Sequence, residues 1–160
     1  MNRPTPLSSA GSNPRRINSG FTLIELMTVL TIVAILLAVG IPSFRSFILS
    51  QRVRAASSDI YVALTLARNA AIHRKTPVTI TKAPAGWQDG WTITTTGPTT
   101  LSQHGAFTSL TVTGSQNSLT YSMTGRLSTP APTFTVTGDS TSRCVTIDLS
   151  GLPSTKKGSC

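Results

Sequence analysis

Residues 20–39 read Gly-Phe-Thr-Leu-Ile-Glu-Leu-Met-Thr-Val-Leu-Thr-Ile-Val-Ala-Ile-Leu-Leu-Ala-Val, an almost uninterrupted apolar run. Glu25 is the only charged residue among the nineteen from Phe21 to Val39. At about 1.5 Å rise per residue, a helix of this length covers roughly 28 Å, which nearly matches a hydrocarbon core of about 30 Å. The sequence therefore predicts a membrane-spanning helix. A carboxylate inside such a span is costly and by default marks a functional site.

Composition and charge limit what the remaining residues can form. The chain has 160 residues, with 14 lysines and arginines against 5 acidic residues and a net charge of +9. Three of the positive charges precede Phe21, so a chain that begins there has a net charge of +6. A basic balance suits anionic partners such as nucleic acid or lipid head groups, and a basic soluble surface explains it equally well. Outside the span, enough residues remain for one modest domain.

Two cysteines, Cys144 and Cys160, lie close together near the C-terminus. Outside the cytoplasm such a pair usually forms a disulfide. A disulfide here would stabilise the domain by about 3 kcal/mol in the chain-entropy model. It would also hold residues 151–159 against the last predicted strand.

The sequence predicts no metal site and no enzyme. Two cysteines and two distant histidines, His73 and His104, supply too few ligands for a metal. No spacing links the aspartates beyond the span to either histidine, so no set of nucleophile, base and orienting acid emerges. We expect His73 near the end of a helix and His104 in a loop, and we expect no cofactor.

Residues 1–20 form a polar leader that carries arginines and no acidic residue. Positive flanks stay in the cytoplasm, so the N-terminus is predicted to lie inside and everything after the span outside. In a conventional signal peptide, the small residues of the cleavage site follow the apolar stretch. Here Gly20 precedes that stretch, so cleavage after Gly20 would keep the hydrophobic helix.

Residues 20–27, Gly-Phe-Thr-Leu-Ile-Glu-Leu-Met, resemble the class III leader junction of type IV pilins and type II secretion pseudopilins. The resemblance implies that a prepilin peptidase cuts after Gly20 and methylates the new N-terminus at Phe21. It also implies that Glu25 pairs with the N-terminal amine of a neighbouring subunit, and pairing with a cation makes a buried carboxylate tolerable. The implied partners are other major and minor pilins or pseudopilins, the peptidase and an inner-membrane assembly platform. The alternative is an ordinary signal anchor with an incidental glutamate.

Residues 21–41 and 42–75 are predicted to be the transmembrane and amphipathic halves of one long helix. Gly40 and Pro42 predict a kink or local unwinding, because proline lacks an amide donor. Type IV pilins and pseudopilins, which this chain resembles, have a helix-breaking residue at this point. The alternative is that Gly40 and Pro42 simply mark the end of the membrane span. Arg45, Arg52 and Arg54 are expected to form a solvated collar facing lipid head groups. One face of the second half carries an apolar stripe that needs a sheet to pack on: Ile60, Leu64, Ala67 and Ala71.

Residues 76–160 are predicted to form antiparallel strands, because apolar residues recur there at every second position. Turn-forming clusters at residues 83–90, 97–100, 114–117, 129–132 and 138–142 separate the strands. One helix face on one antiparallel sheet gives an α+β domain. The resemblance to pilins implies the same arrangement, the pilin fold. The alternating apolar residues are Val78/Ile80, Trp91/Ile93, Leu110/Val112, Leu119/Tyr121, Phe134/Val136 and Val145/Ile147/Leu149.

Residues 86–91, Gly-Trp-Gln-Asp-Gly-Trp, place Trp87 in a predicted turn and Trp91 in the core. This tryptophan pair resembles the GspH/FimT subgroup of minor pilins, to which the type II secretion pseudopilin H belongs. Residues 121–126 and 143–147 resemble strand ends of the same subgroup. The resemblance implies a minor pilin or pseudopilin in a type IV pilus tip or a type II secretion pseudopilus. Before assembly, such a subunit crosses the bacterial inner membrane once and has a periplasmic C-terminal domain.

A DNA-binding minor pilin for natural transformation is the alternative function. Some FimT-type minor pilins are DNA-uptake receptors that use a Gly-Arg-x-Arg element in this region. Residues 151–154 are instead Gly-Leu-Pro-Ser, so both arginines are absent. The candidate DNA contacts are Arg126, Arg143, Lys156 and Lys157. Contacts of these side chains with phosphates would carry no sequence information. The other interpretation of the basic tail is that it is simply solvated.

Overall fold

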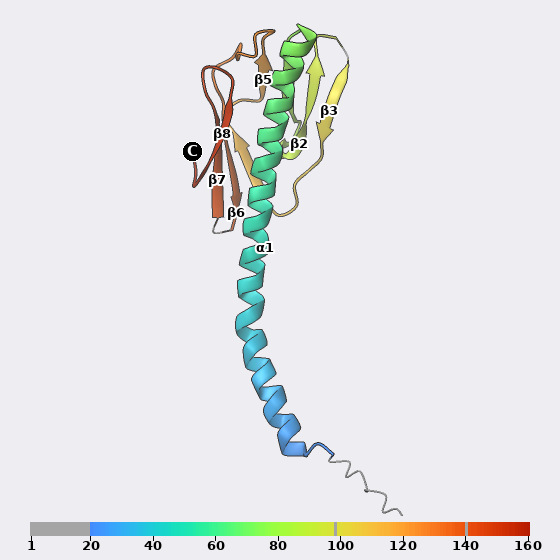
Figure 1. Ribbon diagram of the computed structural model, residues 1–160, viewed down its shortest axis with the longest axis vertical. Coiled ribbons are helices and arrows are strands. Elements are labelled where there is room, and N and C mark those ends of the chain that lie inside the picture. The colour runs from blue at the N-terminus through green and yellow to red at the C-terminus, as the bar shows by residue number, and fades with distance from the viewer. Residues whose placement is uncertain (1–19, 98, 140) are drawn as a thin grey trace, which may run out of the picture. The chain divides into compact units, whose positions relative to one another are not determined.

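The computed structural model describes residues 20–97, 99–139 and 141–160 (Figure 1). The predicted leader, except for Gly20, lies outside the described residues. The described residues form one helix and eight strands: α1 (Leu23–Arg74), β1 (Val78–Ala83), β2 (Gly86–Thr95), β3 (Thr100–His104), β4 (Thr111–Gly114), β5 (Ser118–Tyr121), β6 (Thr133–Gly138), β7 (Thr141–Ile147) and β8 (Pro153–Lys157). The chain divides into two compact units, one ending at Val39 and the other running from Gly40 to Cys160.

In the first unit, the apolar stretch is helical from Leu23 onward. The hydroxyl of Thr22 accepts a hydrogen bond from the backbone amide of Glu25 at 3.3 Å, which caps the start of the helix. The most apolar window of α1 has a mean hydropathy of 2.6, and none of it is buried within the molecule. By length and composition this helix can cross a membrane.

The helix continues without interruption through Gly40 and Pro42. The sequence predicted a kink or local unwinding here, and the structure shows no unwinding. Proline removes one amide donor and leaves one carbonyl without its helical partner. The neighbouring turns keep their own hydrogen bonds, so the helix can pass through this position. A bend at Pro42 that preserves the helix stays a prediction.

In the second unit, α1 packs on two antiparallel sheets rather than on the one sheet predicted (Figure 1). The first sheet has the order β3-β2-β1-β5, and the second has the order β4-β6-β7-β8. The connection from β5 to β6 contains Pro130 and Pro132, which cannot donate ladder hydrogen bonds and so oppose a β5–β6 hairpin. The predicted α+β class and the packing of a long helix on antiparallel strands are confirmed.

One core lies between α1 and both sheets. The predicted helix stripe of Ile60, Leu64, Ala67 and Ala71 is buried. Gly138, at the end of β6, allows the helix to come close, because a Cβ there would lie 2.8 Å from a methyl group of Val53. The buried strand residues alternate as expected for sheets with one face in the core: Val78, Ile80, Trp91, Ile93, Val112, Leu119, Tyr121, Phe134, Val136, Val145 and Ile147.

Several predicted boundaries are wrong. Trp87 lies in β2 and not in a turn. His104 is the last residue of β3 and does not lie in a loop. Leu149 lies beyond β7 and is 84% exposed, so it does not continue the alternation of that strand. β8 was not predicted at all, because only its first residue, Pro153, is buried. An edge strand of this kind lacks the apolar alternation that identifies a strand from sequence.

Candidate functional site

The N-terminal end of α1 places Glu25 in the first turn of an exposed apolar helix. The partial positive charge of the helix N-terminus favours a carboxylate at this position. Within the described residues, the Glu25 carboxylate makes no ion pair and no hydrogen bond. Phe21, which is 78% exposed, precedes the helix together with Gly20 and Thr22. No group in the part of the chain that the structure describes therefore occupies the Glu25 carboxylate.

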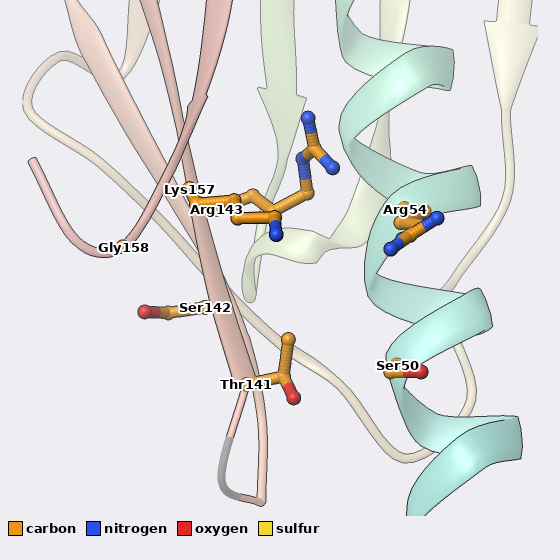
Figure 2. Close-up of a pocket in the computed structure, with 7 residues that line it drawn as sticks. All are labelled: Ser50, Arg54, Thr141, Ser142, Arg143, Lys157 and Gly158. Atoms are coloured by element: carbon orange, nitrogen blue, oxygen red, sulfur yellow. The ribbon is translucent and has the colours of Figure 1, made fainter.

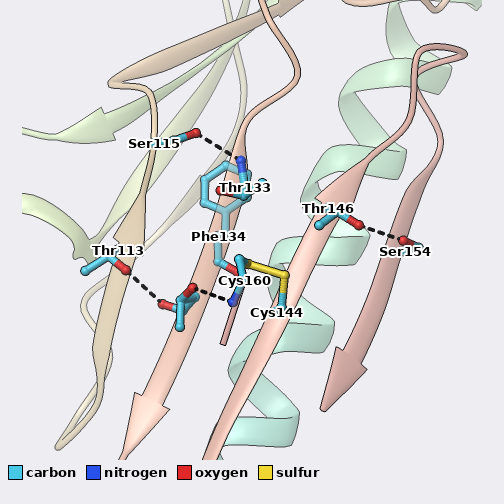
Figure 3. Close-up of a disulfide and its surroundings, with 9 residues drawn as sticks. Thr113, Ser115, Thr133, Phe134, Cys144, Thr146, Ser154 and Cys160 are labelled. Carbon is cyan, nitrogen blue, oxygen red and sulfur yellow. Dashed lines mark hydrogen bonds between the residues drawn. A yellow bond between two sulfur atoms is a disulfide. The ribbon is translucent and has the colours of Figure 1, made fainter. Parts of the chain in front are cut away.

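A disulfide joins Cys144 on β7 to Cys160 at the chain end, with 5.0 Å between their Cα atoms (Figure 3). This pairing confirms the predicted disulfide. The backbone amide of Cys160 donates a hydrogen bond to the hydroxyl of Thr135 at 3.4 Å, so the chain end also reaches β6. The hydroxyls of Thr146 and Ser154 lie 2.9 Å apart between β7 and β8 (Figure 3). The tail is thus held by a covalent bond and by strand pairing.

The loop between β7 and β8 is organised by Asp148. Its Oδ1 atom accepts hydrogen bonds from the Ser150 hydroxyl at 2.7 Å, the Leu152 amide at 2.8 Å and the Ser150 amide at 2.9 Å. These hydrogen bonds, the Ser150 hydroxyl foremost, lower the pKa of the Asp148 carboxyl. Gly151 follows with a φ of 84°, a left-handed conformation that favours glycine.

Tyr121 holds the same loop from the buried side of the sheet. Its hydroxyl donates a hydrogen bond to the Gly151 carbonyl at 3.2 Å, and the side chain is fully buried. Burial raises the pKa of the Tyr121 phenol, while the nearby charge of Arg68 opposes the rise. The Gly-Arg-x-Arg element of DNA-binding minor pilins would lie at residues 151–154. In this chain these residues are held by the hydrogen bonds of Asp148 and Tyr121, and they carry no basic side chain.

The four candidate DNA contacts do not form one surface. Arg143 faces Lys157 across the β7–β8 pair, whereas Lys156 faces Cys144. Side chains alternate between the two faces of a strand, so Lys156 and Lys157 point to opposite faces. Arg126 lies in the β5–β6 connection, next to Gly125, whose carbonyl accepts a hydrogen bond from Arg68 of α1 at 3.2 Å. The structure therefore brings only Arg143 and Lys157 together.

A third cation joins this pair. Arg54 of α1 meets Arg143 and Lys157 at an open cleft of about 390 Å³ (Figure 2). From the sequence, Arg54 is expected in a collar facing lipid head groups, because nothing in the sequence relates α1 to a strand so far along the chain. The remaining lining residues are Ser50, Thr141, Ser142 and Gly158.

His104 pairs with the helix instead of lying in a loop. Its Nε2 atom is 3.6 Å from the Asp59 carboxylate, and its ring stacks on Trp91 with centroids 4.4 Å apart. Trp87 packs edge-on against Phe134 with centroids 4.9 Å apart and donates a hydrogen bond to the Gln116 carbonyl at 2.8 Å. Among the described residues, no three His, Cys, Asp or Glu side chains are placed to hold a metal ion.

Residues 56–151 of the chain match the family model described as Type II transport protein GspH. The chain belongs to the GspH family. Residues 15–41 match the model of the prokaryotic N-terminal methylation motif, which includes Gly20, Phe21 and Glu25. No curated protein gives a significant match to this GspH-family chain.

Solved structures of two pilin-like proteins are similar to this GspH-family chain. Type IV minor pilin FimU of Pseudomonas aeruginosa has a TM-score of 0.61 at 20% identity, over 66% of this chain and 89% of that one. A second crystal form of FimU gives a TM-score of 0.57 at 22% identity, over 64% and 91%. Minor pseudopilin EpsH from the type 2 secretion system of Vibrio cholerae gives 0.56 at 11% identity, over 66% and 97%.

These findings confirm the predicted family and fold. The GspH-family chain is a minor pilin or pseudopilin of a type IV pilus or type II secretion system, anchored through its apolar helix. Pilins and pseudopilins are structural subunits that assemble with one another. None of the matched descriptions mentions DNA, so the DNA-binding alternative gains no support.

Proposed function

We propose that this GspH-family chain is a structural subunit that enters a type IV pilus tip or a type II secretion pseudopilus from the inner membrane. The observation that carries the proposal is the position of Glu25 in the first turn of an exposed apolar helix, where its carboxylate has no ion pair with any residue that the structure describes. In a bundle of such helices, the Glu25 carboxylate lies in apolar surroundings, where an isolated charge is costly. It therefore needs a cation as a partner. Cleavage after Gly20 would supply one, because the new amine at Phe21 is positively charged.

The pairing joins two different subunits and sets their axial register. Each Glu25 receives the N-terminal amine of a neighbour, and the neighbour's helix is thereby fixed along the filament axis. A buried pair of this kind is strongly destabilised when one partner is removed, by about 3–5 kcal/mol. Assembly is therefore selective for subunits that have been cleaved and that keep Glu25.

Two features support the proposed orientation. The basic leader favours a cytoplasmic N-terminus by the positive-inside rule, and the domain from Gly40 onward would then lie in the periplasm. The Cys144–Cys160 disulfide suits the periplasm, since disulfides persist in oxidising compartments. Before assembly, prepilin peptidase and an inner-membrane assembly platform act on the membrane-inserted subunit.

Glu25→Ala tests the pairing in cells that produce the complete filament machinery. We expect unchanged membrane insertion and cleavage, and at least about a tenfold fall in the amount recovered with sheared filaments, because a buried amine loses its partner. Glu25→Asp is the matched control, since it keeps the charge and recovers part of the incorporation. Immunoblots of membrane and filament fractions measure both, and mass spectrometry identifies a methylated N-terminus at Phe21. Wild-type incorporation of Glu25→Ala would refute the pairing.

A further inference from the structure

Three cationic side chains from three separate elements converge on one cleft in the domain. Arg54 comes from α1, Arg143 from β7 and Lys157 from β8, and Figure 2 shows Arg143 and Lys157 pointing from the sheet toward the helix. Arg54 and Arg143 also line an adjoining hollow of about 310 Å³, together with Ser57, Ser58, Tyr61 and Thr155. The two arginines thus form the wall shared by both hollows.

This arrangement is electrostatically unfavourable in the free subunit. Arg143 and Lys157 are direct cross-strand partners, and like charges opposite each other destabilise a strand pair. No acidic side chain is among the described residues that line either hollow. The Nε atom of Arg143 is buried and has no hydrogen-bond partner within the described part of the chain. A buried donor without an acceptor is costly, so an acceptor placed beside Arg143 would stabilise the site.

The chemistry of the lining specifies an oxyanion. A guanidinium presents a planar fork of donors that matches the two oxygens of a carboxylate, and Lys157 adds a point charge. The hydroxyl of Thr141 supplies a further donor at the rim of the cleft. Cationic groups from both the helix and the sheet can then share one anionic group.

The form of the cleft favours a single side chain over a nucleic acid. Arg54 and Arg68 are separated by 14 residues of α1, or about 21 Å, so Arg126 beside Arg68 lies far from the cleft. Lys156 points to the other face of β8. The basic residues therefore do not follow a phosphate backbone, whereas a carboxylate on a flexible stem can enter the recess.

We propose that this cleft receives the carboxylate of an aspartate or glutamate side chain from a neighbouring, acidic pilin or pseudopilin subunit. This inference rests on the proposed function, because it requires a neighbouring subunit. The charge balance supports it: the chain from Phe21 onward has a net charge of +6, and among its few acids Asp59 lies 3.6 Å from the His104 ring and Asp148 accepts hydrogen bonds within the fold. A strongly basic subunit needs acidic neighbours to pack closely. The contact completes the hydrogen bonding of Arg143 and relieves its repulsion with Lys157.

The test uses the full chain in cells that assemble the filament. We expect Arg54→Gln and Arg143→Gln each to reduce incorporation several-fold, and Lys82→Gln, which removes a strand lysine of the other sheet, to leave it unchanged. Each glutamine variant purified in detergent should melt at or above the wild-type temperature, because it relieves repulsion. Loss of incorporation would then not come from misfolding.

The partner is identified by a photo-reactive amino acid at Ser50, followed by mass spectrometry of the cross-linked peptide. We expect a pilin or pseudopilin peptide that contains an aspartate or glutamate. Arg143→Glu in this chain should abolish incorporation, and so should replacement of the cross-linked acidic residue of the neighbouring subunit by lysine. The two changes together should restore incorporation.

Three results would overturn the inference: wild-type incorporation of both glutamine variants, no restoration by the charge exchange, or cross-linking of Ser50 to phospholipid or DNA alone. The proposed function is tested separately by Glu25→Ala. If that variant fails to assemble while the cleft variants assemble normally, the subunit function stands and only the cleft contact is rejected.

Discussion

At the scale of single residues, Asp148 makes the stability of the domain depend on pH. Its carboxylate accepts three hydrogen bonds in the β7–β8 loop, and these lower its pKa below the usual value of about 3.9. Between the lowered and the usual pKa, the unfolded chain binds more protons than the folded one. The contribution of Asp148 is therefore fully present above about pH 4 and is lost as the pH falls through the folded-state pKa.

We predict that Asp148→Asn lowers the melting temperature at pH 7 and weakens its dependence on pH below about 4, because the amide does not titrate. Thermal unfolding followed by circular dichroism from pH 2 to pH 7 measures both effects. Asp139→Asn, in the exposed turn between β6 and β7, controls for the removal of one negative charge. Identical acid limbs for wild type and Asp148→Asn would show that the loop hydrogen bonds do not stabilise the fold.

Single residues also show what the sequence can reveal about a site. Glu25 is identifiable because a lone charge in an apolar run has few structural explanations. Arg54 and Arg143 are not, because their meeting depends on how α1 lies against β7, which no local pattern encodes. The same holds for Trp87: a glycine-flanked tryptophan resembles a turn residue until its packing on Phe134 is known.

At the scale of elements, alternation predicts which strand residues face the core but not which strands pair. Phe134/Val136 and Val145/Ile147 are buried as expected. The division into two sheets follows from the proline-containing connection between β5 and β6 and from register, which the period of two does not contain. Edge strands β3 and β8 were missed, because exposed strands need no apolar face.

The β7–β8 pair carries a prediction about the disulfide. A double Cys144→Ser/Cys160→Ser variant should lose about 3 kcal/mol of unfolding free energy, because the unfolded chain is no longer cross-linked. The loss should spare the native fold, since β8 remains hydrogen-bonded to β7 from Pro153 to Lys157. Denaturant titrations with and without reductant measure it. The reduced wild type should unfold like the double variant, which itself should not respond to reductant. Equal stability of all four samples would contradict the role assigned to this bond.

At the scale of the whole molecule, the chain consists of two units with opposite solvent requirements. The apolar half of α1 contributes no buried residue to the core, whose helix residues run from Val53 to Ala71. The unit from Gly40 to Cys160 holds both sheets, the disulfide and the cationic cleft. The proposed filament assembly would therefore join a membrane-dependent contact at Glu25 to domain contacts that form in water.

This division predicts that a fragment comprising residues 40–160 folds without the membrane helix. We expect it to be soluble without detergent, to contain the Cys144–Cys160 disulfide, and to melt cooperatively within a few degrees of the full chain in detergent micelles, because no core contact is removed. A fragment comprising residues 57–160 is the matched control. It loses Val53 and Ala56, which are 0% and 1% exposed, and burial contributes about 1.5 kcal/mol or more for the valine and about 0.8 kcal/mol for the alanine methyl group. It should therefore melt clearly lower. Loss of cooperative melting in the 40–160 fragment would mean that the apolar half of α1 stabilises the domain, and that the two units do not fold separately.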